Sequence, residues 1–173
     1  MEKQEFKQVL FKVAFCAMTC DGEIHKREIE ELKLINKNTS FFSEIDLSDE
    51  LNQLIDDLKK KGAKLIEELF DYLHNSKLNT IQELIILEVA LRIINSDLKH
   101  DENEMKFIHL LRSKLELHDE TINDRFGELD ILHTYEFSKN IMPDKADPEL
   151  DENIEFPKMS KLMQIDLDVI KPK

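Results

Sequence analysis

A shortage of turn-forming residues is the feature that most limits what this chain can fold into. The 173 residues include three glycines and four prolines, and every proline lies at position 143 or beyond. An all-β domain needs a turn about every 8 to 12 residues, and glycine and proline supply many of those turns. Because the chain before Pro143 offers so few of them, we expect an all-α fold there.

Hydrophobic periodicity locates the helices. Residues 6–20 and 80–94 are apolar nearly all round, which is typical of helices in the centre of a domain. The residues from Thr80 to Glu83 have the pattern of a capping box that opens the second of these helices. Elsewhere apolar residues recur at helical spacing beside charged ones, which is typical of amphipathic helices. About seven helices are predicted, over residues 6–20, 26–35, 48–61, 65–75, 80–94, 102–115 and 119–132, with a bend at Gly127.

The composition changes after Tyr135 to proline, aspartate and glutamate with scattered apolar residues. We therefore divide the chain into a helical domain, residues 1–136, and an acidic, proline-containing C-terminal arm, residues 137–173. The arm is expected to be mostly irregular and to wrap around the domain or a partner.

Charge limits the kinds of partner. A net charge of −13 opposes binding to phosphate backbones, and no Lys/Arg stripe with interleaved aromatic residues occurs, so nucleic acid is not an expected partner. The N-terminus lacks the pattern of a signal peptide, and no stretch approaches the roughly 18 consecutive apolar residues of a membrane span. We expect a cytoplasmic protein that does not insert directly into a membrane.

An internal repeat organises the helical part. The segment that begins at Val13 aligns without a gap with the segment that begins at Val89, and Asp21 and Glu28 then coincide with Asp97 and Glu104. Each copy has the pattern of a buried helix, a short acidic connection, which we call the elbow, and an amphipathic helix. We predict two such units packed about a pseudo-twofold axis, with the two apolar helices buried against each other.

The elbow sequence DGEIHKREIEEL and its degenerate second copy resemble the TerB-like family, known from bacterial tellurite resistance and stress responses. The resemblance covers roughly residues 1–135. It implies an all-helical module without established enzymatic activity, which acts through protein partners in membrane-linked stress complexes. It also implies metal binding by acidic residues, here Asp21, Glu28, Asp97 and Glu104. The second copy departs from the family in having Leu98 where the first has glycine, and the arm is not explained.

The sequence allows two interpretations of these four carboxylates, as ligands of a metal ion or as helix caps. Residues 21–28 have the spacing of the back half of an EF-hand loop, but Ala17 and Thr19 occupy positions that need carboxylates, so this loop alone cannot enclose calcium. A site shared by both elbows, with Asp101 and Glu102 nearby, would suit a divalent cation such as calcium or magnesium.

The second interpretation is structural. Glu28 and Glu104 each fall at the third position of a predicted helix, where a carboxylate accepts hydrogen bonds from free N–H groups. Such a cap typically contributes about 0.5–1 kcal/mol.

Other reactive side chains have structural explanations. Cys16 and Cys20 lie on an apolar helix and are expected to be buried, reduced thiols rather than zinc ligands with His25 and His100. The six histidines are scattered, and most are expected at the surface.

Glu88 and Arg92 are spaced to form an ion pair within one helix. Neither a phosphate-binding glycine loop nor an HExxH motif occurs in the sequence. These patterns favour a protein that is not an enzyme.

Three functional hypotheses result. The leading one is a non-enzymatic, TerB-like stress-response module that docks a partner protein through an acidic face at the elbows. The alternative is a divalent-metal sensor that uses the carboxylates of both elbows, and the third is an enzyme that uses them as acid and base. No cofactor is expected apart from a divalent cation.

Overall fold

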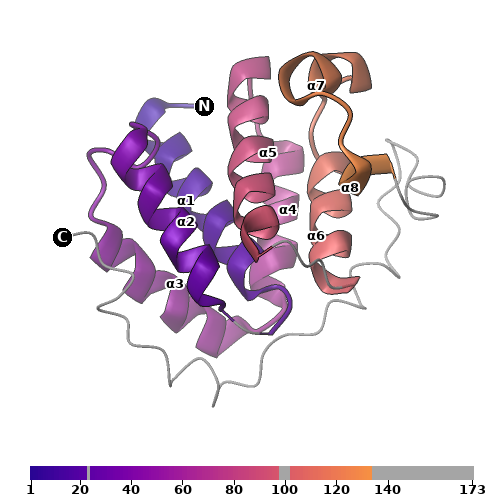
Figure 1. The fold of residues 1–173 in the computed structure, drawn as a ribbon. Coiled ribbons are helices and arrows are strands. Elements are labelled where there is room, and N and C mark those ends of the chain that lie inside the picture. Colours follow the sequence, from indigo (N-terminus) through magenta and orange to yellow (C-terminus); the bar gives the residue numbers. More distant parts are fainter. Residues whose placement is uncertain (23, 98–101, 134–173) are drawn as a thin grey trace.

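The computed structural model describes residues 1–22, 24–97 and 102–133 and shows an all-helical fold (Figure 1). These residues contain eight α-helices, one 3₁₀ helix and no strand, which confirms the predicted fold class. The C-terminal arm, residues 137–173, lies outside the described residues. The elements are α1 (Lys3–Thr19), α2 (Lys26–Asn38), α3 (Leu47–Lys61), α4 (Lys64–Asn75), α5 (Thr80–Ile94), η1 (Asn95–Asp97), α6 (Glu102–Ser113), α7 (Asp119–Phe126) and α8 (Asp130–His133).

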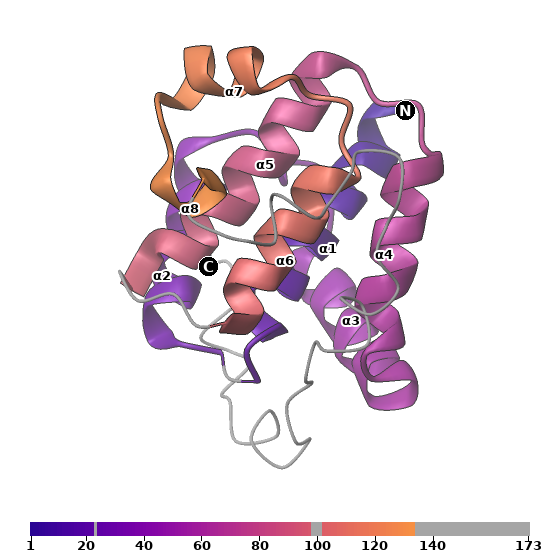
Figure 2. The ribbon, with the colours of Figure 1, turned by 90° about the vertical axis from the view of Figure 1, so that its right-hand side faces the viewer.

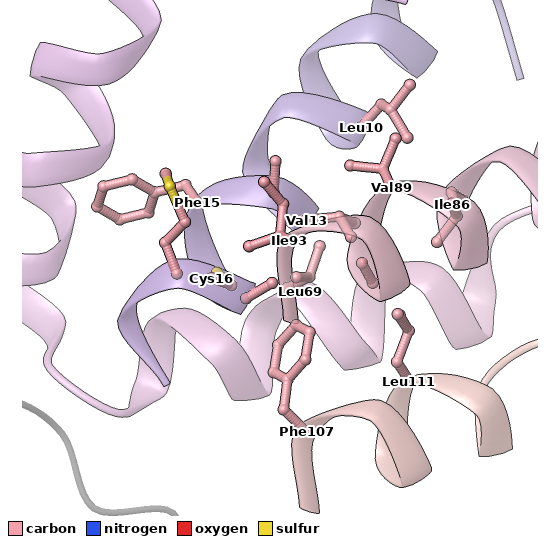
Figure 3. Packing of buried hydrophobic residues seen from close by; sticks show 14 of the residues in the cluster. Leu10, Val13, Phe15, Cys16, Leu69, Ile86, Val89, Ile93, Phe107 and Leu111 are labelled. Atoms are coloured by element: carbon pink, nitrogen blue, oxygen red, sulfur yellow. The ribbon is translucent and has the colours of Figure 1, made fainter. Parts of the chain in front are cut away.

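Helices α1 and α5 form the centre, as their apolar sequences predict. They pack against each other, and side chains such as Val13 from α1 and Val89 and Ile93 from α5 belong to the same buried cluster (Figure 3). Twelve of the 17 residues of α1 are buried, against four of 15 in α3, so α1 is enclosed nearly all round. Ala14 and Ala90 are fully buried small residues, a residue type that lets helix backbones approach closely.

The amphipathic helices cover this pair. Helices α3, α4 and α6 pack against α1, while α2 and α6 pack against α5 (Figure 2). The core continues outward through Phe70 of α4 and Phe107 of α6, whose ring centroids are 5.4 Å apart. The repeat corresponds to α1–α2 and α5–α6, and a twofold relation between the two units stays a prediction.

The residues that begin and end the helices lie at or next to the predicted positions. The capping box of α5 begins one residue earlier than predicted, because Asn79 and Gln82 exchange the two hydrogen bonds. Glu83 is therefore not part of the capping box. Its buried carboxylate instead accepts a hydrogen bond from the backbone N–H of Glu116 at 2.8 Å. Gly127, with φ of 74°, ends α7, so the expected bend separates α7 from α8.

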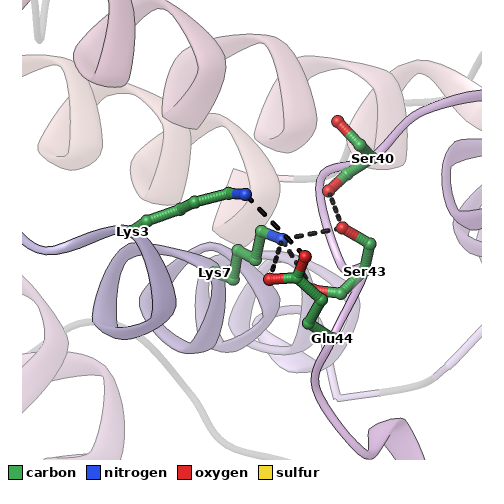
Figure 4. A network of polar contacts seen from close by, with 5 residues as sticks. All are labelled: Lys3, Lys7, Ser40, Ser43 and Glu44. Atoms are coloured by element: carbon green, nitrogen blue, oxygen red, sulfur yellow. Dashed lines mark hydrogen bonds and ion pairs between the residues drawn. The ribbon is translucent and has the colours of Figure 1, made fainter.

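A buried lysine fixes the loop between α2 and α3. Lys7 Nζ donates to the backbone oxygen of Ser43 at 2.8 Å and to its Oγ at 2.7 Å, and lies 3.4 Å from a carboxylate oxygen of Glu44 (Figure 4). The Lys7 side chain is only 7% exposed, so these acceptors replace the water that its ammonium group loses. Glu44, in the same loop, has φ of 70°, a left-handed conformation that is unfavourable for residues other than glycine.

Among the described helices, none combines the length and the apolar character needed to cross a membrane.

The central position of α5 predicts a clear contrast between two of its isoleucines. Ile93 is fully buried, whereas Ile81 is 69% exposed. We expect Ile93→Ala to lower the free energy of unfolding by about 2–5 kcal/mol, because it leaves a cavity in the core. Ile81→Ala should change it by less than about 0.5 kcal/mol. Urea unfolding of both variants measures the difference, and equal effects would contradict the central role of α5.

The lysine contact gives a second matched pair. Lys7→Met should lower the free energy of unfolding by about 1.5–3 kcal/mol, because the loop at Ser43 loses its hydrogen bonds to a charged donor. Lys3, whose side chain is 76% exposed and 3.8 Å from Glu44, serves as the control. Lys3→Met should have an effect of less than about 0.5 kcal/mol by the same unfolding measurement. A larger effect at Lys3 than at Lys7 would show that the burial of Lys7 is unimportant.

Candidate functional site

Glu28 is held in place by the start of α2. It is the third residue of that helix, and its Oε2 accepts the backbone N–H of the N-cap residue, His25, at 2.7 Å. The capping role predicted for Glu28 is therefore confirmed. Glu104 also falls on the third residue of its helix, α6.

The cap satisfies only half of the Glu28 carboxylate. The residue is 1% exposed, and its Oε1 is buried without a hydrogen-bond partner. A buried polar atom of this kind destabilises a fold by about 1–3 kcal/mol and is rare in native proteins. A helix cap alone does not explain why the second oxygen is enclosed.

The surroundings of Glu28 strongly favour its protonated form. Burial raises the pKa of Glu28 from 4.5 to about 9, against the opposing effect of the hydrogen bond from the His25 backbone. The carboxylates of Asp21, Glu104 and Asp97 raise this pKa further by repulsion. The structure thus brings the four sequence-predicted residues into one electrostatic neighbourhood, which we call the elbow cluster: Asp21, Glu28, Asp97 and Glu104.

His25 joins the elbow cluster, although sequence analysis gave it no role there. Its Nε2 lies 2.9 Å from Oδ2 of Asp21. The Asp21 side chain is 7% exposed and that of His25 is 36% exposed, so the imidazole lies between the cluster and solvent. The four-residue spacing of Asp21 and His25 was a signal that could have suggested this contact.

The donor set fits a divalent cation chemically, because it offers carboxylates and a buried oxygen that lacks a partner. Within residues 1–22, 24–97 and 102–133, however, no three His, Cys, Asp or Glu side chains already form an arrangement that could hold a metal ion. Glu102 pairs with Lys106 at 3.2 Å, and Asp101 lies outside the described residues. Binding would therefore require the two elbows to converge further.

The cysteines behave as predicted. Cys16 and Cys20 are thiols rather than members of a disulfide, and both are fully buried. Burial raises the pKa of Cys16 to about 12, so this thiol stays protonated and poorly nucleophilic.

The predicted ion pair within α5 is wrong. Arg92 pairs with Glu31 of α2 at 2.6 Å, and Glu88 pairs with Arg125 of α7 at 3.2 Å. Glu88 and Arg92 therefore each connect α5 to another helix. His109 is an exception to the expectation that most histidines lie at the surface, since it is 4% exposed and burial lowers its pKa.

No family model, curated protein or solved structure significantly matches this chain.

The buried Glu28 predicts a characteristic pH dependence in the metal-free protein. Its pKa of about 9 in the folded state exceeds the ordinary value of 4.5, so the folded state binds the extra proton between these limits. Stability therefore falls as pH rises through this window. Glu28→Gln removes this loss, and its stability advantage should grow from pH 5 to pH 8 by at most about 1.4 kcal/mol per pH unit.

The matched control is Glu30→Gln, which removes an exposed carboxylate from the same helix. Its unfolding free energy should run parallel to that of the original protein across the same pH range. A difference between Glu28→Gln and the original protein that is independent of pH would contradict the assignment.

Proposed function

We propose that this protein is a non-catalytic helical module that binds a divalent cation at the elbow cluster. The observation that carries this proposal is the buried Oε1 of Glu28, which has no partner and lies among three further carboxylates. A cation would supply the missing partner and offset the repulsion among the carboxylates. The resemblance to TerB-like proteins supports the same assignment.

The contacts of the helices suggest what such an ion would change. Glu28 belongs to α2, Asp97 ends η1, and Glu104 belongs to α6, while α2 contacts η1 and α5 directly. An ion shared by these elements fixes α2 relative to the second elbow. Loss of the ion leaves the carboxylates to repel one another, so the site can act as a sensor.

Burial makes direct docking through the elbow cluster the weaker hypothesis. Glu28 and Glu104 are 1% and 2% exposed, so a partner protein cannot contact their carboxylates without a rearrangement. We therefore propose that a partner in a stress-response assembly recognises the ion-dependent arrangement of the helices rather than these four side chains.

Thermal unfolding of chelator-stripped protein tests the proposal. Millimolar calcium, magnesium, manganese or zinc should raise the melting temperature saturably for at least one ion. Stabilisation by a ligand grows with its concentration and reaches about 2.7 kcal/mol at a hundredfold excess over Kd. Asp21→Asn and Asp97→Asn should each reduce the rise, because each removes a charge from one elbow.

Glu30→Gln provides the control for a general charge effect and should retain the full rise. Absence of a shift with every ion would overturn the proposal and leave Glu28 as a helix cap. An equal shift in all three variants would assign the ion to a different site.

A further inference from the structure

Lysines gather where α3 and α4 lie side by side (Figure 2). Lys61 of α3 forms an ion pair with Glu68 of α4 at 2.7 Å. The hydrogen bond from Lys61 lowers the pKa of Glu68, and the positive charges of Lys12 and Lys64 lower it further, so these side chains lie near one carboxylate. Lys59 and Lys60 are exposed at the end of the same helix as Lys61. We call this set the lysine corner: Lys12, Lys59, Lys60, Lys61 and Lys64.

The helices alone do not account for this concentration of positive charge. Lysines in the last turn of α3 suit the negative end of its dipole. Lys64, in contrast, is the first residue of α4, where a positive charge is unfavourable, and Lys12 lies in the middle of α1. Among the described residues, Lys61 is the one member of the corner that forms an ion pair. The corner therefore has positive charge available for another anion.

The C-terminal arm contains an anionic segment that matches the lysine corner. Between Asp144 and Glu155 the sequence has six carboxylates and one lysine. Because the net charge of the chain is −13, most of the domain surface repels this segment, and the lysine corner attracts it. We propose that residues 144–155 dock on the lysine corner of the same chain. This contact goes beyond the proposed function and needs no ion at the elbow cluster.

The connection between the domain and the segment is long enough for this contact. Ten residues separate His133, where α8 ends, from Asp144, and ten residues span at most about 33–36 Å. A domain of about 130 residues has a radius of gyration near 14 Å, so this span is comparable with its diameter. A short tether also gives a segment an effective concentration on the order of millimolar. Contacts between exposed charges that are individually weak can therefore hold the segment.

Chymotrypsin cleavage of the arm tests this inference, because its apolar sites, Leu150 and Phe156, are unchanged in every variant. Cleavage of the full 173-residue chain at these sites should be slow at low salt. About 0.5 M salt should accelerate it at least about threefold, because salt screens exposed ion pairs. A peptide of residues 144–158, cleaved under the same conditions, corrects for the effect of salt on the protease. Lys60→Gln/Lys61→Gln/Lys64→Gln should give the fast rate at low salt as well.

The matched control is Lys33→Gln/Lys37→Gln/Lys77→Gln, which removes the same number of charges from exposed lysines elsewhere on the domain. This control should keep the slow rate at low salt. Unfolding of the domain by either set of substitutions would also expose buried sites such as Phe70, so the fragments separate unfolding from release of the arm.

Three outcomes would overturn the inference. One is an equal cleavage rate at low salt in the original chain and both variants. Another is protection of the arm that depends on protein concentration, which would place the segment on a second copy of the chain. The third is binding of phosphatidylserine vesicles through the lysine corner while the arm is cleaved rapidly, which would assign the corner to a lipid surface.

Discussion

The packing of α1 against α5 is the contact on which the rest of this structure depends. Both helices are apolar nearly all round, so neither can be buried without a complete layer of other helices around it. Each also runs directly toward an elbow. Their mutual burial therefore determines where the two elbows lie, and a hydrophobic contact brings carboxylates from distant parts of the chain close together.

Glu28 differs from the buried side chains of Lys7 and Glu83 in its hydrogen bonding. Lys7 has acceptors at Ser43 and Glu44, and Glu83 receives a backbone N–H. In the described part of the chain, only Oε1 of Glu28 and Nε2 of His109 are buried side-chain atoms without a partner. The His109 ring can remain neutral, which makes its burial tolerable. The carboxylate of Glu28 lies instead beside three acidic groups, so its burial calls for a proton or a cation.

Local patterns account for most of what could be predicted from sequence. The apolar character of α1 and α5 identified the centre of the fold, and the repeat identified the four carboxylates of the elbow cluster. The partner of Arg92 could not be predicted in this way, since Glu31 is distant in sequence and reaches it only through the packing of α2 on α5. The burial of His109 depends on tertiary contacts too. The contact of His25 with Asp21, in contrast, could have been predicted from their spacing of four residues.

The order of the helices along the chain affects how this protein is made. Helix α1 leaves the ribosome before its principal partner, α5, which begins about 60 residues later in the chain. Until then the apolar surface of α1 has only α3 and α4 to pack against, because α2 packs against the missing α5. Such delayed burial slows folding and exposes a nascent chain to aggregation. Separating the two central helices by three others thus lengthens the time before the core can close during translation.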